Sequence, residues 1–157
     1  MPTHAERRVL PYSPEQVYAL IADVESYPEF LPWCSACRVR SRKTLPDGRE
    51  VLEADLVISF KVFRERFGSR VTLSPEERAI RVEYLDGPFR YLNNQWRFHE
   101  VEGAGGRKCE VDFFVDFEFR SRMLQRVVGA VFGEAMQRVV RAFETRAAAI
   151  YGRPGRE

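Results

Sequence analysis

The residues in this sequence that are best suited to chemistry are two cysteines with two residues between them. The segment Trp33-Cys34-Ser35-Ala36-Cys37 has the spacing of a redox dithiol. Thioredoxin-type chemistry requires such a pair at the start of a helix, where the helix dipole lowers the pKa of a thiol. Here the run Arg38-Val39-Arg40-Ser41-Arg42 follows, which predicts a strand, and no βαβ pattern precedes the pair. We therefore expect structural thiols, with a redox role as the alternative.

Metal binding and nucleophilic catalysis would need further residues. A structural zinc site takes four ligands, mostly Cys and His. Beyond the cysteine pair the chain offers Cys109, His99 and His4, without a second paired motif. His4 lies near the N-terminus and His99 precedes Glu100 at a predicted strand end, so no Ser-His-Asp or Cys-His arrangement stands out. We predict no metal site, no catalytic residue and no required cofactor.

A single domain must position whatever site the chain carries. The chain has 157 residues, of which 45% are hydrophobic and 31% charged, a composition typical of a globular protein with a substantial core. We expect one domain over residues 1–157, with its structured core at about 4–151. The 25 basic and 23 acidic residues nearly balance, which argues against nucleic-acid binding driven by overall charge.

The sequence also predicts where the protein works. Three cysteines are too few for a disulfide framework and suit a reducing compartment. No apolar segment that would form a secretory signal follows the N-terminal charges, and no stretch approaches the length of a transmembrane helix. We expect a cytoplasmic protein, and peripheral contact with the inner face of the membrane stays open.

The N-terminal part of the chain predicts a strand, a helix and an aromatic turn. Residues 4–10 are expected to form the first strand. The letters SPEQ then predict a helix start, because Ser13 can cap the helix, Pro14 fits its first position and Gln16 completes a capping box. Residues 27–33 contain two prolines, which prevents a long helix and favours a short helical turn packed by its aromatic side chains.

The middle of the chain alternates between apolar and polar residues with the period of β-strands. The clearest case runs over residues 50–62, where Leu52 and Ala54 share one face and Glu53 lies on the other. Strands are expected at residues 38–44, 50–62, 64–73, 80–84, 89–100 and 109–119.

Most carboxylates fall on the polar faces of these strands, where solvation is the simplest explanation. Glu65 is an exception, because it has the parity of Phe67 and Val71 on its strand. We expect Glu65 to form an ion pair with Arg97 or Arg90 rather than to act as an acid.

The last segment changes to the helical period. Over residues 121–151 the apolar residues recur at spacings of three and four, as in Leu124, Val128 and Val131. A strand, a helix, about six further antiparallel strands and one long helix indicate an α+β fold. We expect an antiparallel sheet of about seven strands that curves around the C-terminal helix. The space between sheet and helix is either a filled core or an apolar pocket.

Four segments carry a resemblance to a known family. They are YPEFLPWC at 27–34, FRERF at 63–67, GPFRYLNNQWRF at 87–98 and AFETRA at 142–147. With the order of the elements, they resemble the coenzyme Q-binding START-domain proteins, which belong with the polyketide cyclases to the START-like helix-grip superfamily. The resemblance covers nearly the whole chain. It implies a helix-grip fold with a cavity between the curved sheet and the long helix.

The resemblance also implies a function. It implies non-enzymatic binding of ubiquinone or a related polyisoprenoid lipid in the cavity, in support of respiratory electron transport, as a chaperone or shuttle. The same sequence family includes bacterial ribosome-association toxins, so inhibition of translation by blocking subunit association is the alternative. A cyclase-like enzyme is the third option, because some cyclases of the superfamily are enzymes. The three options stay open, as do the tail length of the lipid and the oligomeric state.

The side chains on the inner faces of the strands and the long helix would line the cavity. We expect them to be Phe60, Phe67, Tyr84, Leu92, Asn94, Trp96, Phe98, Phe113, Phe117, Val131, Phe132 and Met136. Burial of a prenyl tail against such residues yields roughly 25 cal/mol per Å² of apolar surface. Asn94 and Tyr84 have the parity to donate hydrogen bonds to the carbonyls of a quinone head. A plain hydrophobic core is the alternative reading of each position.

Two surface features could contact a larger partner. Residues 61–64 are expected to form a tip between strands, where Val62 and Phe63 would contact an anionic membrane surface, and an ordinary turn is the alternative. Six arginines on neighbouring strands could form a basic patch for ribosomal RNA or anionic lipid, unless neighbours such as Glu53 and Asp55 neutralise it. They are Arg38, Arg40, Arg42, Arg64, Arg66 and Arg70.

Overall fold

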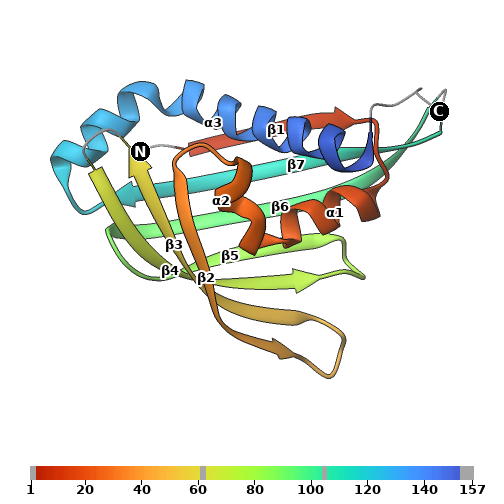
Figure 1. Ribbon diagram of the computed structural model, residues 1–157, viewed down its shortest axis with the longest axis horizontal. Helices are drawn as coiled ribbons and strands as arrows, with labels where there is room; N and C mark the ends of the chain where they lie inside the picture. The colour runs from red at the N-terminus through yellow and green to blue at the C-terminus, as the bar shows by residue number, and fades with distance from the viewer. Residues whose placement is uncertain (1–2, 61–62, 104–105, 153–157) are drawn as a thin grey trace.

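The computed structural model describes residues 3–60, 63–103 and 106–152, and the side chains within these ranges except those at 60, 63, 102, 103, 106 and 107 (Figure 1). Seven strands and one long helix make up most of this part of the chain. In chain order the elements are β1 (Thr3–Leu10), α1 (Pro14–Ala22), the 3₁₀ turn η1 (Val24–Ser26), α2 (Tyr27–Phe30), β2 (Cys34–Thr44), β3 (Glu50–Phe60), β4 (Phe63–Ser74), β5 (Ala79–Asp86), β6 (Phe89–Gly103), β7 (Gly106–Phe119) and α3 (Arg122–Tyr151).

The strands form one antiparallel sheet in the order β1-β7-β6-β5-β4-β3-β2. In Figure 1 the sheet curves, α3 runs along β1 and β7, and α1 and α2 lie in front of the central strands. The predicted α+β architecture, a curved antiparallel sheet of about seven strands around a long C-terminal helix, is confirmed. Several strand boundaries differ from the predicted ones, most of all at β2, which begins at Cys34, four residues before the expected strand.

Irregularities in the strand pairing account for the curvature. The register shifts twice along β2, once between β4 and β5 at Gly68, and once at the start of β6. Such bulges bend a strand and increase its twist. A Cβ at Gly68 would come within 3 Å of the ends of the Asp86 and Arg40 side chains, which would have to move aside.

The helices begin where the sequence predicts. Ser13 Oγ accepts a hydrogen bond from the Gln16 backbone at 3.2 Å, and Gln16 Oε1 accepts one from the Ser13 backbone at 3.0 Å, which completes the capping box of α1. At the other end of the chain, Ser121 Oγ accepts from the Leu124 backbone at 3.1 Å. The Tyr151 hydroxyl donates to the Gln16 carbonyl at 2.8 Å, and this bond holds the end of α3 against α1.

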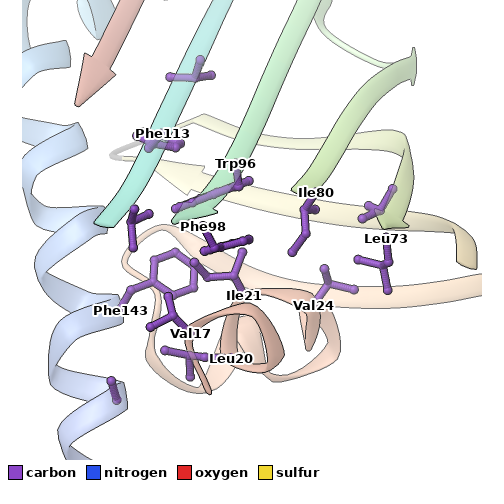
Figure 2. Close-up of a cluster of buried hydrophobic side chains, with 14 of the residues drawn as sticks. Val17, Leu20, Ile21, Val24, Leu73, Ile80, Trp96, Phe98, Phe113 and Phe143 are labelled. Carbon is purple, nitrogen blue, oxygen red and sulfur yellow. The ribbon is translucent and has the colours of Figure 1, made fainter. Parts of the chain in front are cut away.

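The interior around α1 is tightly packed. Val17, Leu20 and Ile21 of α1 are buried and point toward Phe98 of β6 and Phe143 of α3, as Figure 2 shows. The void that remains among these side chains measures only about 20 Å³. We call this part of the interior the filled end.

Candidate functional site

A cavity of about 280 Å³ lies on the other side of the interior, between the sheet and α3. We call this part of the interior the hollow end. Its volume is close to the lower limit of ligand-binding pockets. The lining comes from the segment after α1, from six strands and from α3: Val24, Tyr27, Leu31, Pro32, Trp33, Cys34, Leu56, Ile58, Phe67, Ser69, Val71, Ile80, Val82, Phe89, Leu92, Asn94, Trp96, Phe113, Val115, Phe117, Phe119, Val128, Val131, Phe132, Ala135, Met136, Val139 and Phe143.

Aromatic side chains form a partition between the two ends. Trp96, Phe113 and Phe143 border both the hollow end and the void at the filled end. The ring of Trp96 lies 4.4 Å from that of Phe113 and 5.4 Å from that of Phe143, measured between centroids. These contacts connect the sheet with α3 and separate the tightly packed side chains from the cavity.

The spacing of residue sizes along α3 explains why the helix does not fill the cavity. Phe132 contacts Phe117 of β7 at 5.1 Å between ring centroids, and Phe143 contacts Trp96 three helical turns later. These large rings hold α3 at a distance from the sheet. Between them the helix presents Ala135, Met136 and Val139 to the cavity, and the short side chain of Ala135 takes up the least of its space.

Asn94 is a polar group of the lining. Its Nδ2 donates to the Phe114 carbonyl at 2.8 Å, and its Oδ1 accepts from the Trp96 indole at 3.1 Å. An amide nitrogen carries two hydrogens, and only one of them is used in these bonds. The two bonds hold the amide in place, and its second N–H takes part in neither of them.

Ser69 was missed by the sequence analysis. It is completely buried and borders the cavity, and its hydroxyl has only a long contact of 3.4 Å with the Ala54 carbonyl. The sequence contained an indication of this role, because Ser69 is a polar residue between Phe67 and Val71 on the inner face of β4.

The segment after α2 was also missed as part of the site. Leu31, Pro32, Trp33 and Cys34 border the cavity, whereas the sequence indicated only a packed aromatic turn. Trp33 has a φ of 65°, which is unusual for a residue other than glycine, and its carbonyl accepts from the Ser59 backbone at 2.8 Å. This bond fixes the segment to β3.

The structure brings nine of the predicted lining residues to the cavity. They are Phe67, Leu92, Asn94, Trp96, Phe113, Phe117, Val131, Phe132 and Met136. That these residues bind a ligand stays a prediction. The side chains of Phe60 and Phe63, and the whole of Val62, lie outside the described residues, so the predicted membrane contact at that tip is not tested.

Tyr84 and Phe98 do not border the cavity, which corrects the prediction. Tyr84 packs its ring against Phe89 at 5.5 Å, and its hydroxyl accepts from the Phe89 backbone at 3.1 Å. Phe98 is 2% exposed and packs against Tyr18 of α1 at the filled end. Parity gave the correct face for both residues, but it does not say how far along the strand the cavity extends.

The cysteine pair has no sign of redox activation. Burial raises the pKa of Cys34 to about 11 and that of Cys37 to about 11, so both thiols stay protonated at neutral pH. The thiolate is the reactive form, and activated cysteines have a lowered pKa. Within the described residues, no three His, Cys, Asp or Glu side chains gather as metal ligands.

The predicted ion pair of Glu65 is absent from the described structure. Arg90 instead lies 3.7 Å from Glu118 of the neighbouring strand β7. Glu65 has the parity of the inner face of β4, whereas Arg97 is exposed on the outer face of β6. The two side chains therefore lie on opposite faces of the sheet.

The predicted basic patch on the outer face is largely neutralised. Arg40 lies 3.2 Å from Asp55, and Arg66 lies 2.5 Å from the same carboxylate. Arg70 lies 3.4 Å from Glu53. Arg42 also pairs with Glu50 and Glu25, but on the other face, because the bulge after Val39 turns Arg42 to the side of its cross-strand partner Leu52. Alternating charges on adjacent strands thus satisfy one another, as the acidic neighbours in the sequence indicated they could.

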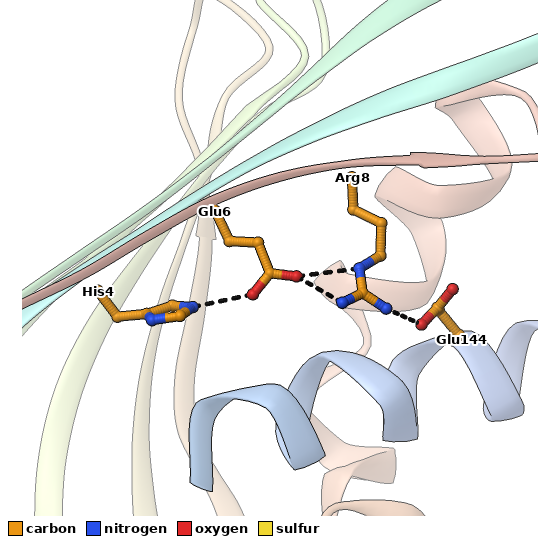
Figure 3. A network of polar contacts seen from close by, with 4 residues as sticks. All are labelled: His4, Glu6, Arg8 and Glu144. Atoms are coloured by element: carbon orange, nitrogen blue, oxygen red, sulfur yellow. Dashed lines mark hydrogen bonds and ion pairs between the residues drawn. The ribbon is translucent and has the colours of Figure 1, made fainter. Parts of the chain in front are cut away.

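A polar network joins β1 to α3 along the filled end (Figure 3). His4 lies 2.9 Å from Glu6, and Arg8 Nε donates to Glu6 at 2.9 Å. Arg8 also forms an ion pair with Glu144 of α3. Partial burial alone would lower the pKa of Arg8, but Glu144 and Glu6 raise it above its ordinary value. The network attaches the helix to the edge strand without entering the cavity.

None of the helices in the described ranges is both long enough and apolar enough to span a bilayer.

The chain is similar in sequence both to bacterial toxins and to a coenzyme Q-binding protein. The chain is 35% identical over 143 residues to the ribosome association toxin of Rickettsia prowazekii. This match covers 89% of this chain and 92% of the toxin. The chain is 37% identical over 153 residues to the mitochondrial coenzyme Q-binding protein homolog B of Xenopus laevis. That match covers 96% of this chain but 59% of the relative, so the chain spans less than two thirds of its length.

Solved structures confirm the helix-grip fold. An 18 kDa protein of Caulobacter crescentus superimposes with a TM-score of 0.79 at 34% identity, over 98% of this chain and 100% of that one. A Streptomyces aromatase/cyclase superimposes with a TM-score of 0.75 over 93% of each chain, but at 16% identity this shows the fold alone. Residues 10–144 match the family described as polyketide cyclase/dehydrase and lipid transport. Because that match extends over most of the chain, the protein belongs to this family.

Proposed function

We propose that this protein binds ubiquinone or a related polyprenyl quinone at the hollow end, without catalysing a reaction. It would support respiratory electron transport as a chaperone or shuttle. The observation that carries the proposal is the cavity itself, which is open space of about 280 Å³ lined almost entirely by hydrocarbon and aromatic groups. The similarity to a relative named for coenzyme Q binding supports the same ligand class.

The lining suits an isoprenoid tail. Each buried CH₂ group contributes roughly 0.8 kcal/mol, so one five-carbon isoprene unit contributes roughly 3–4 kcal/mol before the costs of ordering. Two units in contact with aliphatic groups such as Leu92 and Met136 would give useful affinity without any charged contact. Methionine also adapts its shape to irregular ligands.

The polar groups suit a quinone head. The uncommitted N–H of Asn94 is a donor in an apolar wall, where a hydrogen bond to a carbonyl has little competition from water. The buried hydroxyl of Ser69 supplies a second donor, because its contact with the Ala54 carbonyl is long. Two neutral donors match the two carbonyl oxygens of a benzoquinone.

The composition of the lining supports binding rather than acid–base catalysis. Among the described residues that border the cavity, none is His, Asp, Glu, Lys or Arg. The phenol of Tyr27 is the most acidic oxygen there, and burial raises its pKa far above the ordinary value. Its hydroxyl also donates to the Ile21 carbonyl. A general acid or base with a pKa near neutrality is therefore absent from this lining.

Organic extraction of the purified protein, followed by mass spectrometry, tests the proposal. The wild-type protein should release about one polyprenyl quinone per chain. An Ala135→Leu variant, which places three more carbon atoms in the cavity, should release little, while Ala149→Leu on the exposed side of α3 should match wild type. Equal quinone content in all three proteins, or none in any of them after expression in quinone-producing cells, would refute the proposal.

Association with the ribosome is the second candidate, because several relatives are named ribosome association toxins and the match covers 92% of the first of them. Sucrose-gradient sedimentation with ribosomal subunits tests it. Co-sedimentation with a subunit that disappears at high salt and persists in Ala135→Leu would favour this function over lipid binding.

A further inference from the structure

Four arginines surround a second hollow, of about 370 Å³, where β6 starts and β7 leads into α3. They are Arg90, Arg120, Arg122 and Arg126, and the one carboxylate in the lining is Glu118. We call this region the arginine end. Glu118 lies 3.7 Å from Arg90, so the charges of the lining sum to about three positive units (four minus one).

The arginine end differs from the outer face of the sheet, where carboxylates neutralise the arginines. Arg122 and Arg126 are exposed and have no ion-pair partner among the described residues. Arg120 donates from Nε to the Phe89 carbonyl at 3.0 Å, a bond that holds the side chain in place and leaves its charge unpaired. Three of the four cations therefore have no carboxylate partner among the described residues.

The placement of these cations works against the stability of the fold. The first turn of α3 contains no acidic residue, and Arg122 is its first residue. A positive side chain at a helix N-terminus is repelled by the helix dipole, and the arginines also repel one another. An external anion would relieve both repulsions.

An exposed apolar residue accompanies the charges. Met123 is 65% exposed and lies between Arg122 and Leu124 at the start of α3. Cations around a flexible apolar side chain match the surface of an anionic bilayer, where phosphates meet the arginines and the apolar group enters the acyl boundary. An RNA surface offers phosphates but nothing for the thioether to enter.

We propose that the arginine end docks on the surface of an anionic lipid bilayer. The location fits lipid exchange, because Phe119 borders both the arginine end and the quinone cavity. In Figure 1 this end of the molecule is where the arrow of β7 meets the start of α3. The role of the docking in lipid exchange rests on the proposed function, but membrane binding itself requires no quinone.

Vesicle co-sedimentation tests the docking, with phosphatidylcholine vesicles that contain either no or about one third phosphatidylglycerol. The full-length protein should bind the anionic vesicles far more strongly, and salt should weaken the binding. The double variant Arg122→Gln/Arg126→Gln should bind about 30-fold more weakly, given the usual contribution of a basic residue near such a surface. Met123→Ser should reduce binding about 3- to 10-fold at all salt concentrations.

A matched control removes the same charge elsewhere. Arg38→Gln/Arg81→Gln alters two exposed arginines of β2 and β5 that also have no described ion-pair partner. This variant should bind anionic vesicles nearly as wild type. An equal loss in both double variants would overturn the proposal, as would equal binding of wild type to neutral and anionic vesicles.

Two further measurements separate the possible failures. Quinone binding in solution, without vesicles, should be the same in Arg122→Gln/Arg126→Gln and wild type, so a failure of docking leaves the proposed ligand intact. If the double variant instead loses ribosome co-sedimentation and keeps vesicle binding, the surface recognises RNA and the membrane proposal is wrong.

Discussion

The filled end and the hollow end of this protein are built from the same kinds of residue, yet only one of them is packed. At the filled end, α1 inserts Val17 and Ile21 between the sheet and α3, and the void that remains is about 20 Å³. At the hollow end the sheet faces the short elements η1 and α2, whose Val24 and Tyr27 border the cavity of about 280 Å³ without filling it. The difference lies in which element covers the sheet and not in hydrophobicity. An apolar interior of this kind can serve as a core or as a binding site, according to what covers it.

The largest expected effect is the loss of a packed side chain at the filled end. Ile21→Ala should lower the free energy of unfolding by about 3–4 kcal/mol, because a 2% exposed side chain leaves a new void. Met136→Ala at the hollow end should cost about 1–2 kcal/mol, since the side chain already faces open space and has fewer contacts to lose. Urea denaturation of both variants measures the difference, and equal losses would mean that the cavity is closed in solution.

Replacing an alanine of α3 by leucine should change the free energy of unfolding in opposite directions at the two ends. Ala135→Leu places three more carbon atoms into the cavity and should stabilise the protein by about 1–2 kcal/mol. Ala147→Leu on the same helix has no space, because Ala147 is completely buried, and should destabilise by about 1–3 kcal/mol. Helix propensity is matched between the two, so thermal or urea denaturation reports packing alone. A destabilised Ala135→Leu would contradict the account of the hollow end.

The alkylation rates of the cysteine thiols at different pH values provide another comparison of the two ends. Burial raises the pKa of Cys34 at the hollow end and of Cys109 at the filled end to about 11 each, from 9.0. At pH 8 the thiolate fraction of Cys34 is about 100-fold below that of a free cysteine, so alkylation should be slow and should accelerate about tenfold per pH unit up to about 11. Cys109, 0% exposed, should react more slowly still, and bound quinone should protect Cys34 alone.

The same raised values fix the sign of the pH dependence of stability. Between pH 9 and about 11 the folded state holds more protons on these thiols than the unfolded state does. Their contribution to stability is therefore fully present below pH 9 and is lost as the pH rises toward 11. Denaturation of Cys34→Ser at pH 8 and pH 10 checks this, because the decline between these pH values should be smaller than in wild type.

The smallest expected effect comes from the polar network above the filled end. A double-mutant cycle with Arg8→Met and Glu144→Gln should give a coupling of about 0.5–1 kcal/mol, because both side chains are about one third exposed. The coupling should shrink at high salt. A coupling near zero would show that packing alone attaches α3 to β1.

Much of the fold could be predicted from local patterns. The capping residues Ser13 and Ser121, the alternation along β3 and the period of α3 are properties of neighbouring residues, and each predicted its element. The candidate site depends on more distant relations. Parity placed Phe98 and Tyr84 on the inner face, but only the position of α1 and the bulges decides which inward residues meet the cavity.

The parts of the site that were missed have the same cause. Pro32 and Trp33 border the cavity because Trp33 bonds to Ser59, a partner that lies far along the chain. The arginine end was missed because Arg90 and Arg126 are brought together by the meeting of β6, β7 and α3. Conversely, the arginines of β2 and β4 formed a clear pattern in sequence, and their neutralisation required the cross-strand register that pairs Arg70 with Glu53.

The most direct test of the account uses the two tryptophans, Trp33 and Trp96, which both border the cavity. Titration with a short-chain ubiquinone should quench their fluorescence saturably at one quinone per chain, and the single-tryptophan variants Trp33→Phe and Trp96→Phe should each retain part of the quenching. Ala135→Leu should abolish the saturable quenching while the fold is kept. Quenching that rises linearly with quinone, or that is equal in Ala135→Leu and wild type, would contradict the claim that the hollow end binds the ligand.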